Sequence, residues 1–211
     1  MGHSKKYIGI AVLLAAFLSG CAQKGPVLVD FRYQPPKGEI AEAPKAAVEV
    51  SPFKDDRGKV ESVVGNRFLS LNNQKNDLVI QGTVSGKVTA ALKNALKARD
   101  ITAKDISAWD LTDAGIPGDG AGLLISGEIK TLWVEVASQL ANTTAKADVQ
   151  LRVLVADPAQ KKIIRVLNVN STLERQTIKY SNAFVAGTLS EALSTAIDQI
   201  FADEELKNRL K

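Results

Sequence analysis

The residues best suited to chemistry are two carboxylates and a guanidinium in a row, Asp55-Asp56-Arg57, directly after a strand-like segment. Adjacent carboxylates can hold a cation, and an arginine can clamp an anionic group with two parallel hydrogen bonds. Aspartate also commonly ends a strand by forming a turn, in which case Arg57 pairs back onto it. The second interpretation is favoured. The triplet, together with Trp109, remains the candidate contact for an anion or a partner.

Histidine and cysteine are almost missing, which excludes several catalytic classes. His3 is the only histidine and Cys21 the only cysteine. Serine and cysteine nucleophile systems need a histidine base, and zinc sites need several histidine or cysteine ligands. One loop holds the acids Asp110, Asp113 and Asp119, but their spacing does not match a calcium-binding loop. We therefore expect no metal, no cofactor and no enzymatic activity.

The first twenty residues have the pattern of a secretory signal peptide. Lys5 and Lys6 provide a positive start, and residues 7–18 carry no charge. A cationic start, a short apolar segment and small residues at its end are typical of such signals. The apolar segment is too short to cross a bilayer, because a spanning helix needs about 20 residues. We expect residues 1–20 to be removed.

The end of this segment resembles the lipobox of bacterial lipoprotein precursors. The matching residues, in order, are Leu18, Ser19, Gly20 and Cys21. The resemblance implies that the Cys21 thiol receives a diacylglycerol, that the chain is cut before it, and that the new amine is acylated. In sorted lipoproteins of this kind an aspartate after the cysteine retains the protein in the inner membrane. This chain has Ala22 there, which implies the periplasmic face of the outer membrane.

The charge pattern does not indicate nucleic-acid binding. The chain has 27 Lys and Arg against 23 Asp and Glu, with an isoelectric point near 9.1. Two of the basic residues leave with the signal, and the remaining charges of both signs are interspersed. Proteins that bind DNA or RNA cluster their basic residues instead. We expect a membrane, reached through the lipid, and a protein or glycan of the envelope as partners.

The rest of the chain divides into a linker and one domain. Residues 21–45 contain several prolines and no lasting apolar periodicity, so we expect the lipidated cysteine to be followed by a flexible tether. Residues 27–29 could form a short strand on the domain, but an unfixed segment is the favoured interpretation. The domain itself is expected over 46–206, and residues 207–211 are expected to fray.

Apolar periodicity predicts the elements of this domain. Alternating or β-branched segments predict strands at 47–53, 66–71, 78–81, 123–136, 145–155 and 163–173. Spacings of three and four predict helices at 84–99 and 187–202, the second of which could instead begin near Asn182. Gly127 is the expected bulge, and Trp133 is expected in the core. The order predicts a two-layer α+β domain, a mainly antiparallel sheet with two helices on one face.

Several of these features together resemble the YajG-like family of bacterial lipoproteins. They are the lipobox, the Phe53–Arg57 segment with Val64-Gly65 after it, the helix at 92–98, and the Ile125–Val134 segment. The likeness covers residues 46–206. It implies an α/β domain akin to the periplasmic modules of the TolB N-terminal, PelC and LpoB kind, and it implies no catalytic residues.

These observations favour a non-enzymatic accessory, structural or partner-binding lipoprotein of the cell envelope. The alternative is a lipid- or ligand-binding auxiliary component of an envelope transport system, which would need a sizeable apolar cavity or groove. A hydrolase that uses paired carboxylates is the weakest candidate, because no recognisable catalytic motif places any two of the acids.

Overall fold

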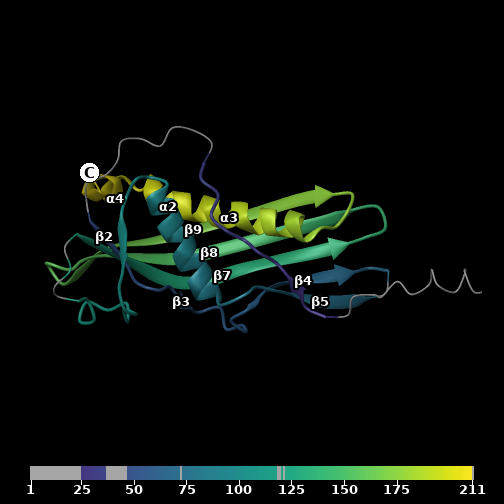
Figure 1. The fold of residues 1–211 in the computed structure, drawn as a ribbon, viewed down its shortest axis with the longest axis horizontal. Coiled ribbons are helices and arrows are strands. Elements are labelled where there is room, and N and C mark those ends of the chain that lie inside the picture. Colours follow the sequence, from purple (N-terminus) through teal and green to yellow (C-terminus); the bar gives the residue numbers. More distant parts are fainter. Residues whose placement is uncertain (1–24, 37–46, 72, 118–119, 121, 211) are drawn as a thin grey trace, which may run out of the picture.

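The computed structural model describes residues 25–36, 47–71, 73–117, 120 and 122–210, and it shows a two-layer α+β domain. One nine-stranded sheet forms the first layer, and the helices of the described ranges lie on one of its faces (Figure 1). The predicted fold class is therefore confirmed. The signal segment and its lipobox, Leu18, Ser19, Gly20 and Cys21, lie outside the described residues.

The sheet is built around one long central strand, β7 (Leu123–Ser138). On one side β7 pairs with β8 (Thr143–Asp157), which pairs with β9 (Lys162–Thr177), and this part is an antiparallel meander. On the other side β7 pairs in parallel with three shorter strands in turn, β2 (Val48–Val50), β3 (Lys54–Asp55) and β4 (Val63–Leu69).

The remaining strands complete the two edges of the short-strand side. Strand β6 (Ala103–Asp105) pairs with β2, and β5 (Gln74–Val79) pairs antiparallel to β4. The outermost strand there is β1 (Val27–Leu28), which pairs in parallel with β5. The long strands are thus antiparallel, as predicted, whereas the short strands add parallel pairs.

Helix α2 (Val84–Lys97) forms as its sequence predicts. The Thr83 side chain accepts a hydrogen bond from the Gly86 amide at 3.1 Å, which caps the first turn. The apolar stripe faces the core, and all of its members are buried: Val84, Val88, Ala91, Leu92, Ala95 and Leu96. This stripe packs against the sheet and against the second helix, α3.

Helix α3 (Asn182–Ala202) begins at the earlier of its two predicted starts. Ser181 caps it by accepting from the Phe184 amide at 3.1 Å. The predicted start near Gly187 is wrong, because Thr188 is buried inside the helix, where its hydroxyl donates to the Phe184 carbonyl. A short helix α4 (Glu204–Leu210) follows. The predicted frayed end is also wrong, since Leu206 and Leu210 bury their side chains in the core.

The predicted flexible tether is wrong for residues 25–36. This segment, which we call the arm, starts beside β5 and then crosses the helical layer (Figure 1). Val29, Phe31 and Tyr33 are buried in the main core. The backbone amides of Arg32 and Gln34 donate to serine hydroxyls of α3. Apolar side chains at alternate positions fix the arm to the domain. The prolines of this region had indicated a flexible segment instead.

We predict that Phe31→Ala lowers the free energy of unfolding by about 3–5 kcal/mol, the usual range for a buried phenylalanine. Leu28→Ala in the same arm is the matched control, because Leu28 is 55% exposed and its truncation should cost less than about 1 kcal/mol. Urea denaturation of both variants measures the difference. Equal midpoints would show that the arm contributes nothing to folding.

Candidate functional site

The face of the sheet opposite the helices is polar, and we call it the outer face. Along β8, the side chains of Ala147, Val149 and Leu151 point into the core, whereas Lys146, Asp148 and others between them point outward. Within the described ranges, no helix packs on this outer face. A half-exposed polar sheet face on an otherwise well-packed domain is where a partner or ligand can bind.

One end of the outer face is closed by a loop that contains Trp109. The ring is only 7% exposed and packs with Leu124, Leu154 and Ile116 in a small second core. Its indole nitrogen donates to the Thr112 carbonyl at 2.8 Å. The prediction of Trp109 as a partner contact is therefore wrong, because the ring is used to hold the loop on the sheet.

The acids of this loop also have structural roles. Asp110 accepts hydrogen bonds from the amide and hydroxyl of Thr112, and Asp113 accepts from the Ile163 amide at 2.6 Å. Asp119 lies outside the described residues. Over the part of the chain that the structure describes, no three acidic, histidine or cysteine side chains are grouped to hold a metal ion.

Arg57 and Asp55 form a buried ion pair that builds the fold. Two guanidinium nitrogens reach the two Asp55 oxygens at 2.8 Å each, and the Arg57 side chain is only 2% exposed. The remaining donors go to backbone carbonyls, Val63 at 2.8 Å and Leu132 at 3.2 Å. The guanidinium is fully used within the protein, so the structural interpretation is correct and Arg57 is not available to clamp an anion.

The ionisation of Asp55 reflects the same pair. Burial raises the pKa of the Asp55 carboxyl, but the hydrogen bonds and charge of Arg57 outweigh it and leave the pKa below its ordinary value. Asp55 is therefore a carboxylate at neutral pH, where it keeps Arg57 in place.

A network of surface charges continues along β7 from this pair. Lys130 lies 2.6 Å from Asp56 and 3.0 Å from Glu128, and Arg152 reaches Glu128 from β8 at 3.2 Å. The Lys130 hydrogen bonds lower the pKa of both carboxyls, and these carboxyls raise the pKa of Lys130. Asp56 is thus paired rather than free, although it is half exposed.

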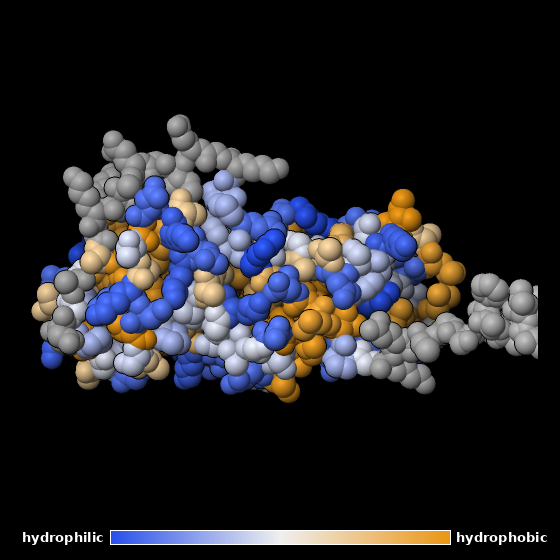
Figure 2. Space-filling view, viewed as in Figure 1, coloured by the Kyte–Doolittle hydropathy of each residue, from blue (hydrophilic) through white to orange (hydrophobic). Residues whose placement is uncertain are grey.

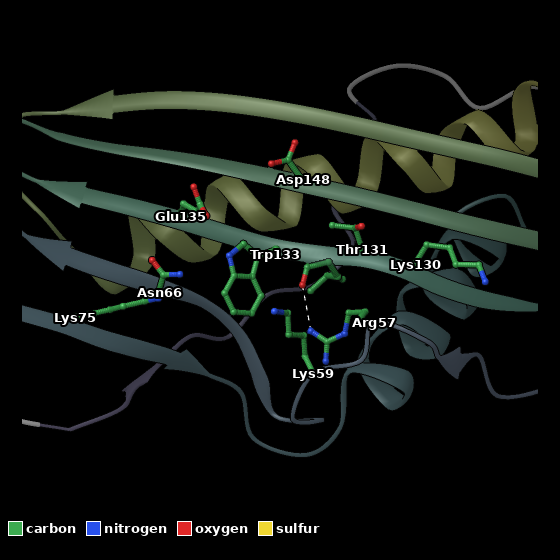
Figure 3. A pocket seen from close by; sticks show the side chains of 10 residues that line it. Arg57, Lys59, Asn66, Lys75, Lys130, Thr131, Trp133, Glu135 and Asp148 are labelled. Carbon is green, nitrogen blue, oxygen red and sulfur yellow. Dashed lines mark hydrogen bonds between the residues drawn. The ribbon is translucent and has the colours of Figure 1, made fainter.

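Beyond this network the outer face is hollowed into a groove of about 460 Å³ around Trp133. Figure 3 shows the indole of Trp133 projecting outward from β7, with Lys59 beside it and Glu135 and Asp148 on the neighbouring positions. The Lys59 ammonium lies 5.4 Å from the ring centroid, a cation–π contact. The groove therefore combines one large aromatic surface with charges of both signs.

Trp133 was predicted in the core, and the structure shows why that prediction is wrong. The bulge in β7 lies between Ile129 and Thr131, not at Gly127. Without it, alternation from Ile129 would direct Thr131 and Trp133 inward. The extra residue shifts the phase, so that Leu132 and Val134 fill the core and Trp133 faces outward. The sequence did contain a signal for this orientation: Leu132, Val134 and Val136 are apolar at alternate positions, which places Trp133 and Glu135 on the opposite face.

Gly127 has a different role from a bulge. A β-carbon there would lie 2.3 Å from the Arg152 carbonyl oxygen and 2.9 Å from the Phe53 ring. The glycine therefore allows β8 and Phe53 to approach β7 closely.

Comparison with known proteins gives one family match for this chain. Residues 113–211 match a family described as "Uncharacterized lipoprotein". The YajG-like resemblance is thereby confirmed, and no enzymatic family is indicated. A comparison with curated proteins gives no match.

Several solved structures of bacterial proteins are similar to this chain. Protein XCC0632 from Xanthomonas campestris has a TM-score of 0.55 at 12% identity, over 83% of this chain and 91% of that one. A putative neuraminyllactose-binding hemagglutinin homolog from Helicobacter pylori scores 0.43 at 10% identity, over 86% and 96%. PelC from Paraburkholderia phytofirmans, solved as a dodecamer, scores 0.38 at 9%, over 74% and 89%. The first of these supports the fold alone.

We predict that Arg57→Met lowers the free energy of unfolding by about 3 kcal/mol at neutral pH, because it leaves the largely buried Asp55 carboxylate without its partner and the Val63 carbonyl without its donor. The pKa of Asp55 is depressed in the folded state, so its contribution is present above about pH 4 and is lost at lower pH. The difference from the native protein should therefore narrow on acidification.

Urea unfolding at neutral and at acidic pH measures this effect. Lys59→Met is the matched control, since Lys59 is an exposed cation of the same loop and its loss, its contact with Trp133 included, should change stability by less than about 1 kcal/mol. A midpoint of Arg57→Met equal to that of the control would contradict the structural role of Arg57.

Proposed function

We propose that this chain is an outer-membrane lipoprotein, anchored through a lipid on Cys21, whose periplasmic domain binds another envelope protein without catalysing a reaction. The lipobox resemblance and the lipoprotein family support the anchor. In the described part of the chain no helix is long and apolar enough to cross a membrane. Two or more acyl chains suffice for stable anchoring.

We predict that Cys21→Ala abolishes incorporation of radiolabelled palmitate and leaves an uncut precursor, because the thiol is the acceptor of the first lipid. Gel mobility and labelling measure both effects. Lipid still entering the variant would refute Cys21 as the attachment site. Sucrose-gradient fractionation of the native protein tests its membrane, and recovery with inner-membrane markers would contradict the outer-membrane assignment.

The groove around Trp133 is the observation that carries the partner-binding part of the proposal. Aromatic side chains that are half buried among polar neighbours often dominate the binding energy of protein interfaces. The strands beside the groove add a row of alternating charge, Glu135, Lys146 and Glu174, directly paired across β7, β8 and β9. Such a pattern suits a partner surface with a complementary row of charges.

The chemistry of the groove favours a protein over the other candidate partners. The groove is lined mostly by charged side chains, which do not suit an acyl chain as the lipid-binding alternative would need. A sugar ring would stack on a free aromatic face, whereas the Lys59 ammonium occupies the region over the Trp133 ring. A glycan is therefore the second candidate, and the following experiment separates the two.

We predict that a photo-crosslinking amino acid at Glu135, which lines the groove, captures one discrete product in intact cells. The same photo-crosslinking amino acid in place of Lys97, which is exposed on α2, should capture no product. Trp133→Ala should reduce the yield from position 135 by about tenfold, as the loss of an interface anchor does. Digestion of the product by protease indicates a protein, and digestion by a muramidase indicates a glycan. Equal yields at 135 and 97 would refute the groove as the binding site.

A further inference from the structure

Three large apolar side chains are strongly exposed at one end of the sheet. Leu71 follows β4, Leu140 lies in the β7–β8 turn and Ile178 follows β9, and they are 71%, 84% and 86% exposed. Figure 2 shows apolar side chains gathered at the right-hand end of the molecule, where these strands end in Figure 1. Single exposed apolar residues are ordinary, but a group of them at one site calls for an explanation.

The sheet register brings these three residues together. Leu69 at the end of β4 pairs with Ser138, and Thr177 at the end of β9 pairs with Thr143. The three segments therefore leave the sheet at the same level. Neighbouring strands are about 4.8 Å apart, so β4 to β9 spans about 15 Å across this end, which we call the sheet tip.

The sheet tip has an excess of positive charge, although Arg175 there forms an ion pair with Glu191 of α3. Segments 67–76, 136–145 and 175–181, which form the tip, contain no aspartate or glutamate. Their charged residues are Arg67, Lys75, Arg175 and Lys179. The Arg67 guanidinium stacks on the Tyr180 ring at 3.4 Å, which adds an aromatic group with a polar end to the same region. Exposed apolar side chains, a tyrosine and an excess of basic residues suit an anionic phospholipid surface.

The arm enters the sheet from the same end of the molecule. Strand β1 is parallel to β5, with Val27 opposite Leu78, and Leu78 is at the level of Gly65 and Val134. The chain before Val27 therefore approaches from the sheet tip, which lies four residues, or about 13 Å, beyond that level. Cys21 is six residues before Val27 and can be at most about 20 Å from it.

We propose that the sheet tip rests on the phospholipid bilayer that holds the anchor, with Leu71, Leu140 and Ile178 inserted into its interface. This inference rests on lipidation of Cys21. Because the arm is fixed to the domain, only the short segment between Cys21 and Gly25 remains as a tether. The strands then stand upright on the membrane, and the Trp133 groove on their side stays open to the periplasm.

The experiment uses the lipidated protein in vesicles of phosphatidylethanolamine and phosphatidylglycerol. With the thiol of Cys21 blocked by its lipid, a cysteine introduced at Leu140, Leu71 or Ile178 can be labelled alone with an environment-sensitive fluorophore. The matched control is Val166→Cys, which is exposed on β9 but pairs with Leu154, eleven residues from the end at Thr177. We expect nitroxide-bearing lipid to quench the three tip labels about threefold more than the control label, as contact with the interface requires.

The outcomes separate this inference from the proposed anchor. Protein that does not float with the vesicles refutes lipidation. If the protein floats but an aqueous quencher reaches the tip labels as readily as the label at 166, the tip is not on the membrane and the inference is overturned. Tip labels shielded from both quenchers would mean that another protein or a second copy of the chain covers the tip, which also overturns it.

Discussion

A gap along the edge of β7 is closed by one buried side chain, and the arrangement of the short strands depends on it. Strand β3 pairs with β7 up to Ile129, and β4 begins to pair at Val134. Between them the Leu132 carbonyl accepts its hydrogen bond from Arg57, which also binds the Val63 carbonyl at the start of β4. A buried carbonyl without a donor costs about 1–3 kcal/mol. The guanidinium, aligned by Asp55, thus takes the place of a missing piece of strand.

The two ends of the outer face differ in composition, and the groove lies between them. The loop that contains Trp109 closes one end with a small apolar core, and the other end carries exposed apolar side chains and an excess of positive charge. Between them lie the paired charges around Lys130 and the groove at Trp133. Trp109 therefore stabilises the outer face, whereas Trp133 lines the groove.

The arm changes how the domain is presented to other molecules. A flexible tether of some two dozen residues would let the domain move far from the bilayer, whereas an arm with Val29, Phe31 and Tyr33 buried does not. Ion pairs fix it further, with Lys87 to Asp30 at 2.7 Å and Arg99 to Asp198 beside the Tyr33 hydroxyl. Residues 25–36 therefore move with the domain and do not act as a flexible spacer.

The sequence by itself determined the features that depend on neighbouring residues. Alternation gave the three long strands, three-and-four spacing gave the buried stripe of α2, and the run from Leu18 to Cys21 predicts the anchor, which remains a prediction. Only the tertiary structure decided the phase of Trp133, the burial of Trp109 and the packing of the arm and of Leu206. Each of these depends on contacts between residues far apart in the chain, because a bulge is set by the partner strand and an apolar side chain is buried only where another element covers it.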